Sequence, residues 1–436
     1  MAEPRGEFSR DGVVQAIERW FPPQWFSRFA AEPGWSAQKL LWMGMLMNWV
    51  AGHTLTERFL AAREVLQTLK PRWRVPSSLS GYGAAWMRVE PELLDAVVTR
   101  LRGQVCGLDL PPVLGWQLFG VDGSRFECPR TKLNERVLGC AGKEHTTPQL
   151  YQTTLWHLDS ELPWDFRVGP GTDSEQRQLD DMLETLPAGS LLTADANFIS
   201  FGLCSQLLRR NVHFLLRVGG HRTLLTELGG DHEVVGQTVY LWPQNHRNQP
   251  PITLRMIVVP GGQTPVYLLT DLRDPIQLSD ADAAELYRRR WGGEVYYRTV
   301  KRTFPFAKLA SRSPHHARIE QRTMLISLWL LQLTSVAARH EEDLPPRRWS
   351  GATARVRMRD WLRRVLVGRS KRRTTTLVHQ LANAVTDSYQ RTRPKQRRHW
   401  PRKKSESPPG PPKQRPATEL ERVRAKYLWD QTQLKL

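Results

Sequence analysis

Cysteine is scarce in this 436-residue sequence, which contains four and no Cys-x-x-Cys pair. So few cysteines in so long a chain do not form a disulfide framework, and none of their spacings with histidine matches a zinc finger or ribbon. We therefore expect a protein of the reducing cytoplasm without structural zinc.

Long apolar runs are missing as well. The longest, residues 323–338, includes Ser, Gln and Thr and is shorter than the roughly 20 residues that a membrane span needs. The first residues lack the basic and then apolar pattern of a signal peptide. Because 40% of the residues are hydrophobic, the chain can bury a core, and we expect a soluble globular protein with no membrane partner.

Acidic residues are outnumbered, with 43 Asp and Glu against 63 Lys and Arg, which gives a net charge of +20. Most of the excess lies in residues 341–436, which hold 25 basic and 9 acidic residues. A positive charge confined to one end favours a segment that binds a polyanion, and nucleic acid is the usual one for a protein with a pI near 10.3. A basic tail is also a common aid to solubility.

The chain divides into four regions. Residues 1–110 have apolar positions at helical spacing and predict a helical domain. Residues 111–340 alternate short strands with helices, which predicts an α/β domain, and residues 213–272 within it form a β-rich insertion. Residues 341–390 predict basic helices. Residues 391–436 predict a flexible arm, because their first 26 residues include ten basic residues and seven prolines, followed by a short terminal helix.

Two aspartates of the α/β region end predicted strands. Asp122 ends an apolar run that starts at Leu118, and Asp195 ends a buried strand predicted over residues 190–195. Both have a structural interpretation too, since Asp122 with the next glycine is a hairpin-turn pair and Asp195 could cap the following helix. Between them, Thr172 and an acidic residue three positions later have the spacing of a capping box, which predicts a helix over residues 172–186.

A long helix predicted from Ser279 to about residue 304 gathers polar side chains on one face. At 100° per residue, an arc about 60° wide holds a carboxylate, two cations and a phenol. These residues are Glu294, Arg290, Lys301 and Tyr287, flanked by Arg298 and Trp291. The alternative is an ordinary ion pair of Glu294 with Arg290 or Arg298 at i±4.

This charged face suits a divalent metal beside a phosphodiester. The carboxylate can hold the metal, while the cations and the tyrosine hydroxyl hold phosphate oxygens. Asp122, Asp195 and Glu294 together offer the hard oxygen ligands that Mg²⁺ prefers, and they are what a ribonuclease-H-like sheet supplies. Two such ions activate a water or a 3′-hydroxyl and stabilise the leaving oxygen in phosphoryl transfer.

These residues carry a resemblance to the insertion-sequence-four family of DDE transposases. The first aspartate lies in VDGSRFECP from Val121 to Pro129, and the second in LTADANF from Leu192 to Phe198. The most specific match is the family's Tyr-Arg-Glu-Lys signature, formed here by Tyr287, Arg290, Glu294 and Lys301. The resemblance covers about residues 115–340 and does not extend to the tail.

The resemblance implies a ribonuclease-H-like catalytic core with a β-rich insertion. Asp122, Asp195 and Glu294 would be the catalytic, metal-binding triad for two Mg²⁺ ions, for which Mn²⁺ can substitute. Phosphates of the DNA would be bound by Tyr287, Arg290, Arg298 and Lys301. Candidates for stacking on a displaced base are Trp242, Tyr267 and Trp291, although Trp242 and Tyr267 also suit strand packing.

The resemblance also implies the partners. Family members cut double-stranded DNA at terminal inverted repeats and join the 3′-hydroxyl ends to target DNA as a homodimer in a synaptic complex, some of them through a hairpin. This predicts a bacterial, nucleoid-associated protein, in which the N-terminal helices recognise the ends.

Two positions depart from the family pattern, Asn197 where glycine is usual and Gly293 where an apolar residue is usual, and neither removes a ligand. Two other functions stay open on the sequence alone: a catalytically weak or inactive DNA-binding relative that inhibits transposition, and a nuclease without a joining step.

Overall fold

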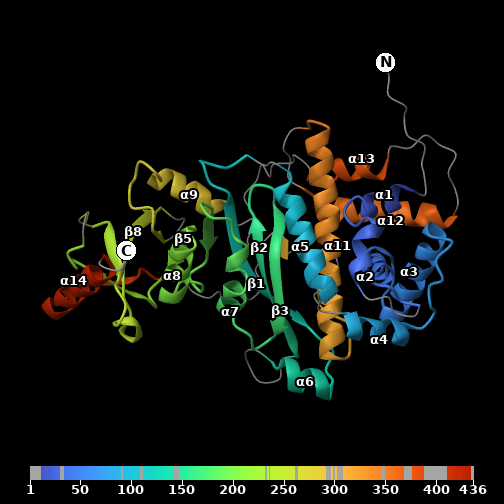
Figure 1. Ribbon diagram of the computed structural model, residues 1–436, viewed down its shortest axis with the longest axis horizontal. Coiled ribbons are helices and arrows are strands. Elements are labelled where there is room, and N and C mark those ends of the chain that lie inside the picture. Colours follow the sequence, from blue (N-terminus) through green and yellow to red (C-terminus); the bar gives the residue numbers. More distant parts are fainter. Residues whose placement is uncertain are drawn as a thin grey trace, which may run out of the picture.

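A mixed sheet of ten strands runs through the protein, in the order β10-β6-β7-β8-β9-β5-β4-β1-β2-β3 (Figure 1). The strands are β1 (Leu118–Glu127), β2 (Gln149–His157), β3 (Leu162–Pro170), β4 (Leu191–Ala194), β5 (His213–Val218), β6 (Thr223–Thr226), β7 (Thr238–Leu241), β8 (Ile252–Val259), β9 (Val266–Thr270) and β10 (Lys413–Pro416). This computed structural model describes residues 11–29, 34–89, 92–108, 111–140, 147–230, 233–234, 236–260, 264–290, 296–297, 300–301, 308–344, 349–367, 376–386 and 410–433.

The centre of the sheet is parallel and its flanks are antiparallel. β4 pairs in parallel with β1 on one side and β5 on the other, whereas β2 and β3 continue from β1 in antiparallel fashion. All four residues of β4 are buried, as expected for the apolar sequence of a central parallel strand. The predicted mixed α/β fold is confirmed in this general form.

The β-rich insertion extends this sheet rather than forming a separate one. β9 pairs antiparallel with β5, and β8, β7 and β6 follow in antiparallel order. The last part of the chain then adds β10 in parallel to β6.

The predicted flexible arm is therefore wrong at its end. Residues 413–416 form β10, whereas α14 (Glu419–Gln433), which follows it, is the predicted terminal helix. Trp429 of this helix lies against Tyr240 of β7, with ring centroids 6.1 Å apart. Proline is tolerated in β10 because it is an edge strand, where one side of the backbone needs no ladder hydrogen bond. The rest of the predicted arm, residues 391–409, lies outside the described residues.

Helices fill the N-terminal region, as predicted. They are α1 (Asp11–Glu18), α2 (Ala37–Trp49), α3 (Leu55–Leu69), α4 (Leu79–Val89) and α5 (Glu92–Cys106). In α2, eleven of the thirteen residues are buried, which fits a sequence of Leu, Met and Trp with almost no polar face. This helix packs between α3 and the long helix α11 (Pro314–Glu341).

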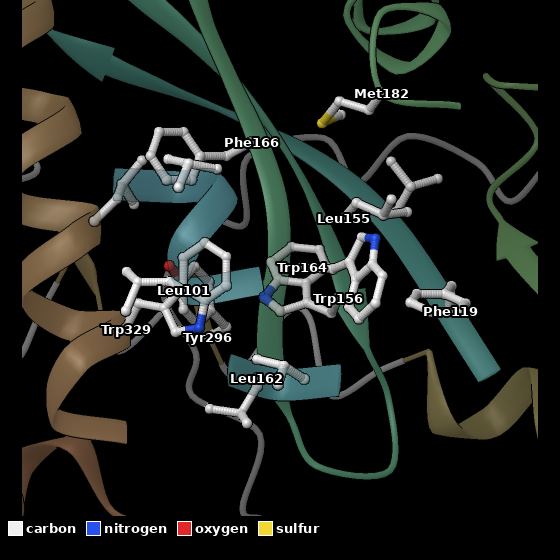
Figure 2. Close-up of a cluster of buried hydrophobic side chains, with 14 of the residues drawn as sticks. Leu101, Phe119, Leu155, Trp156, Leu162, Trp164, Phe166, Met182, Tyr296 and Trp329 are labelled. Carbon is white, nitrogen blue, oxygen red and sulfur yellow. The ribbon is translucent and has the colours of Figure 1, made fainter. Parts of the chain in front are cut away.

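One hydrophobic core joins these helices to the sheet. Figure 2 shows part of this core, with Leu101 of α5, Trp329 of α11 and Phe166 of β3 among its side chains. α5 and α11 both contact β3. α11 also contacts α12 (Gly351–Val367) and α13 (Leu377–Ala382), the helices predicted for the basic region. None of the described helices, α11 included, is long and apolar enough to cross a membrane.

The predicted helix over residues 172–186 is shorter in the structure. α7 (Glu175–Asp180) begins after Ser174, and a 3₁₀ turn follows at residues 183–185. Thr172 lies in a tight turn instead, since the N–H of Asp173 donates to the carbonyl of Pro170 at 2.9 Å. The capping box was therefore wrong, and Glu175 is left to make another contact.

A buried ion pair connects α3 to α11. Arg58 donates to Glu320 at 2.9 Å, and both side chains are more than 90% buried. Glu320 also accepts the N–H groups of Ala310 at 3.0 Å and Ser311 at 2.9 Å. Its carboxylate thus accepts hydrogen bonds from one guanidinium and two backbone N–H groups inside the core.

We expect Glu320→Gln to lower the free energy of unfolding by about 3 kcal/mol, because it removes the negative charge from a buried, hydrogen-bonded ion pair. Urea-induced unfolding measures the loss. The matched control is Glu285→Gln, which removes an exposed pair with Arg288 and should cost less than about 1 kcal/mol. Equal losses in the two variants would contradict the role given to the buried pair.

Candidate active site

The strand register brings the two predicted aspartates together. Gly120 of β1 pairs with Thr193 of β4, so Asp122, two residues further on, lies level with Asp195. Neighbouring strands are about 4.8 Å apart, and residues two apart along a strand face the same side. Asp122 also pairs with Thr154 inside a strand that continues to Glu127, so the hairpin-turn interpretation is wrong.

Asp122 is partly buried and lies among other charges. Its Oδ1 accepts the N–H of Gly123 at 2.9 Å. Burial raises the pKa of Asp122 to about 6, and the like charges of Glu175 and Asp195 act in the same direction, while Arg290 opposes them. This carboxylate therefore lies near a second and a third carboxylate.

Asp195 faces a cation on the next strand. Its Oδ1 accepts the N–H of Ala196 at 2.8 Å and lies 3.7 Å from Nη1 of Arg217. Ala194 pairs with Leu216 in the β4–β5 ladder, which places Arg217 level with Asp195. Sequence reasoning missed Arg217; the signal was an arginine one residue from the end of an otherwise apolar strand, His213–Val218.

The charged helix face predicted around Tyr287 and Arg290 turns toward the same place. α9 (Asp280–Arg289) begins after Ser279, whose Oγ accepts the N–H of Asp282 at 3.1 Å, as predicted. The Arg290 guanidinium lies over the Tyr287 ring at 5.3 Å, and both residues are buried. Arg290 interacts electrostatically with Asp195 and Asp122, and its buried Nε makes no hydrogen bond to a described residue.

Lys301 approaches the site from the other end of this segment. Its Nζ lies 5.1 Å from the centre of the Phe126 ring. Burial lowers the pKa of Lys301, and the charge of Asp122 opposes that shift. Three members of the predicted signature, Tyr287, Arg290 and Lys301, therefore surround the two aspartates.

Glu294, Trp291 and Arg298 lie outside the described residues. The same segment contacts the site between Glu294 and Arg298, because the Tyr297 hydroxyl donates to the carbonyl of Asp122 at 2.9 Å. The rings of Tyr296 and Tyr297 pack edge-on against Trp156 at 5.2 and 5.3 Å. Sequence reasoning did not single out these two tyrosines, which anchor the segment after Glu294.

The donors present fit a hard divalent cation. Among the described residues, no group of three His, Cys, Asp or Glu side chains is close enough to hold a metal ion by itself. Asp122 and Asp195 nevertheless offer carboxylate oxygens at one sheet position. Burial is the main cause of the raised pKa of Asp122, the charges of Glu175 and Asp195 add to it, and a bound cation would stabilise the charged carboxylate.

Two of the three candidate stacking residues, Trp242 and Tyr267, belong to the insertion. Trp242 is 2% exposed, its Nε1 donates to the carbonyl of Gln249 at 2.7 Å, and the Arg247 guanidinium covers its ring at 4.2 Å. These contacts favour the packing interpretation of Trp242. Tyr267 is partly buried in β9, opposite Val218 of β5.

Comparisons with known proteins agree with this arrangement. Residues 117–330 match the transposase DDE domain family. Over 223 residues the chain is 27% identical to the transposase InsG for insertion sequence element IS4 of Escherichia coli (strain K12), and this match covers 48% of the chain and 50% of that protein. The chain thus spans about half the length of this relative.

A solved structure, the piggyBac transposase synaptic complex with hairpin DNA, is similar with a TM-score of 0.45 and 12% identity, over 88% of this chain and 87% of that one. The match of residues 117–330 and the similarity to InsG confirm the resemblance read from the sequence. Residues 117–330 are thus similar to the transposase DDE domain family, and the chain is similar to the transposase of insertion sequence element IS4.

Proposed function

We propose that this protein is a DNA transposase that cuts at the terminal inverted repeats of its mobile element and joins the 3′-hydroxyl ends to target DNA. The observation that carries the proposal is the β1–β4 register, which sets Asp122 level with Asp195 and within the field of Arg290. The same sheet supports a ribonuclease-H-like core, because three antiparallel strands, β3, β2 and β1, are followed by the parallel strands β4 and β5.

Asp122, Asp195 and Glu294 are the residues that we assign to two Mg²⁺ ions. Bound ions of this kind activate a water or a 3′-hydroxyl and stabilise the leaving oxygen. Arg290, Lys301 and the Tyr287 hydroxyl are placed to bind phosphate oxygens, and Arg298 is assigned with them from the motif alone. The buried Nε of Arg290 supports this role, because an anionic oxygen is the acceptor it lacks among the described residues.

The protein acts on double-stranded DNA as a homodimer in this proposal. End recognition is assigned to the helices of residues 1–110, which share their core with α11 and are thereby held in a fixed relation to the catalytic sheet. A base displaced at the DNA end would stack on Tyr267 or Trp291, since Trp242 is covered by Arg247.

We expect Asp122→Asn, Asp195→Asn and Glu294→Gln each to reduce strand cleavage about a thousandfold or more, because each removes a negative ligand worth several kcal/mol in the transition state. The substrate is DNA that carries the flanks of the protein's own gene, incubated with and without Mg²⁺. Glu285→Gln, on the exposed side of α9, should cleave at the wild-type rate.

DNA binding of all four variants is measured beside cleavage by electrophoretic mobility shift. Specific binding by the wild type without any Mg²⁺-dependent cut would exclude the catalytic assignment and favour the inhibitor alternative. Cuts at the repeats without joined products would favour the nuclease alternative.

The raised pKa of Asp122 predicts that ionisation of this carboxyl lowers the free energy of unfolding of the metal-free protein as the pH rises. A folded-state value of about 6, above the ordinary 3.8, means that the stability from this group is fully present below pH 3.8 and is lost as the pH rises through 6. Asp122→Asn should therefore raise the free energy of unfolding at pH 8 by about 1–3 kcal/mol and change it little at pH 4.

Urea-induced unfolding in EDTA at the two pH values checks this difference. Asp181→Asn makes the same chemical change at an exposed position of the neighbouring segment and is measured beside it as the control. A stabilisation by Asp122→Asn that is equal at pH 4 and pH 8 would contradict the buried-charge explanation.

Residues 391–409 contain eight basic residues and lie in the sequence between α13 and β10. α13 and α14, the helix after β10, lie toward opposite ends of the molecule (Figure 1). If they contact DNA phosphates, replacing the eight with serine flattens the plot of log affinity against log salt by about 0.9 per lost contact. Fluorescence anisotropy with duplex DNA from about 50 to 200 mM KCl measures the slope. An unchanged slope would show that this segment makes no phosphate contact.

A further inference from the structure

A further carboxylate, Glu175, lies beside Asp122. The Tyr151 hydroxyl donates to Glu175 Oε2 at 2.6 Å. A Cβ added to Gly123 would lie 2.8 Å from that same oxygen and closer still to the Tyr151 hydroxyl. The two side chains therefore occupy the space over the peptide next to Asp122, and only glycine at position 123 leaves room for them.

The fold holds Glu175 in this place from two directions. The tight turn after β3 starts α7 at Glu175, so this carboxylate lies at the first turn of the helix. The next residue, Gln176, donates its side-chain N–H to the carbonyl of Asn197, which lies two residues after Asp195. The first turn of α7 thus contacts both the strand of Asp122 and the loop of Asp195.

The surroundings of Glu175 leave its charge uncompensated. Among the described residues, Glu175 makes no ion pair, and the Arg125 guanidinium lies over the Tyr151 ring at 4.6 Å, while Arg177 lies 3.9 Å from Asp173. Its negative charge acts on Asp122 more strongly than that of Asp195 does. Two neighbouring carboxylates repel each other at neutral pH, and a divalent cation relieves that repulsion.

We propose that Glu175 is a positioning residue of the acidic site, oriented by Tyr151 to accept hydrogen bonds from the hydration shell of a divalent ion held by Asp122. This inference rests on the proposed function. A water-mediated role fits because Asp122, Asp195 and Glu175 do not by themselves form a three-ligand cluster among the described residues, and because Mg²⁺ keeps several waters in protein sites.

The test is Mn²⁺ binding to the full chain without DNA, followed by the electron paramagnetic resonance signal of free Mn²⁺. Glu175→Gln should weaken the affinity by about 10- to 100-fold, the usual effect of losing an outer-shell partner. Tyr151→Phe should weaken it less, since the carboxylate stays. Glu184→Gln makes the same chemical change at an exposed position near the end of the segment and should bind Mn²⁺ like the wild type.

Two measurements distinguish a structural role of Glu175 from a metal-directed one: the melting temperature in EDTA and the Mn²⁺ affinity of a conservative variant. If Glu175 only supported α7, Glu175→Gln would lower the melting temperature in EDTA and Glu175→Asp would not restore Mn²⁺ binding. We expect the opposite: an unchanged or higher melting temperature in EDTA, because a repulsion is removed, and partial recovery of Mn²⁺ affinity in Glu175→Asp.

The outcomes also separate this inference from the proposed function. Wild-type Mn²⁺ affinity in Glu175→Gln, with weakened affinity in Asp122→Asn, overturns the role of Glu175 and leaves the metal site in place. Unchanged Mn²⁺ affinity in Asp122→Asn, Asp195→Asn and Glu175→Gln alike overturns both.

Discussion

The parallel pairing of β1 with β4 is the constraint on which the rest of the site depends. It sets two carboxylates, Asp122 and Asp195, at neighbouring positions of one sheet. Two unit charges about 5 Å apart at an effective dielectric constant of about 20 repel by roughly 3 kcal/mol, so the pair needs positive charge nearby. Arg217 on β5 and Arg290 after α9 supply part of it from two different elements. The site is thus a balance of charges imposed by strand register.

These charged groups keep their relative positions only if the elements that carry them are held together, and α11 holds several of the elements around the sheet together. This helix packs against α2, α5 and β3, so the N-terminal helices and the sheet share one core and cannot shift independently. The Tyr297 hydroxyl then fixes the segment after Glu294 to the backbone of Asp122. Functional groups held by packed elements keep their geometry better than groups on free loops, which suits chemistry that depends on placing two carboxylates beside a third.

Much of this site could be predicted from the sequence, because its signals are local. Apolar runs that end in aspartate indicated strands at Asp122 and Asp195, although β1 continues past Asp122 to Glu127, and helical spacing grouped Tyr287 with Arg290. Arg217 could not be found in this way, since its role depends on which strand lies next to β4. The same limit explains the error at residues 413–416: local composition indicated an arm, whereas pairing with β6, nearly 200 residues earlier, decides the structure.

For Glu175 the local sequence pattern was misleading, because it predicted a capping contact near Thr172. Three residues after Thr172, it has capping-box spacing, but the turn at Pro170 moves the helix start and frees its carboxylate for Tyr151. The carboxylates of the described site lie close to its cations, so a DNA phosphate that binds Arg290 and Lys301 also comes near the negative charge of Asp122 and Asp195. Divalent ions are repelled by the cations of the site, and DNA phosphates are repelled by its carboxylates. Their binding should therefore be mutually dependent, because each supplies the charge that the other half lacks.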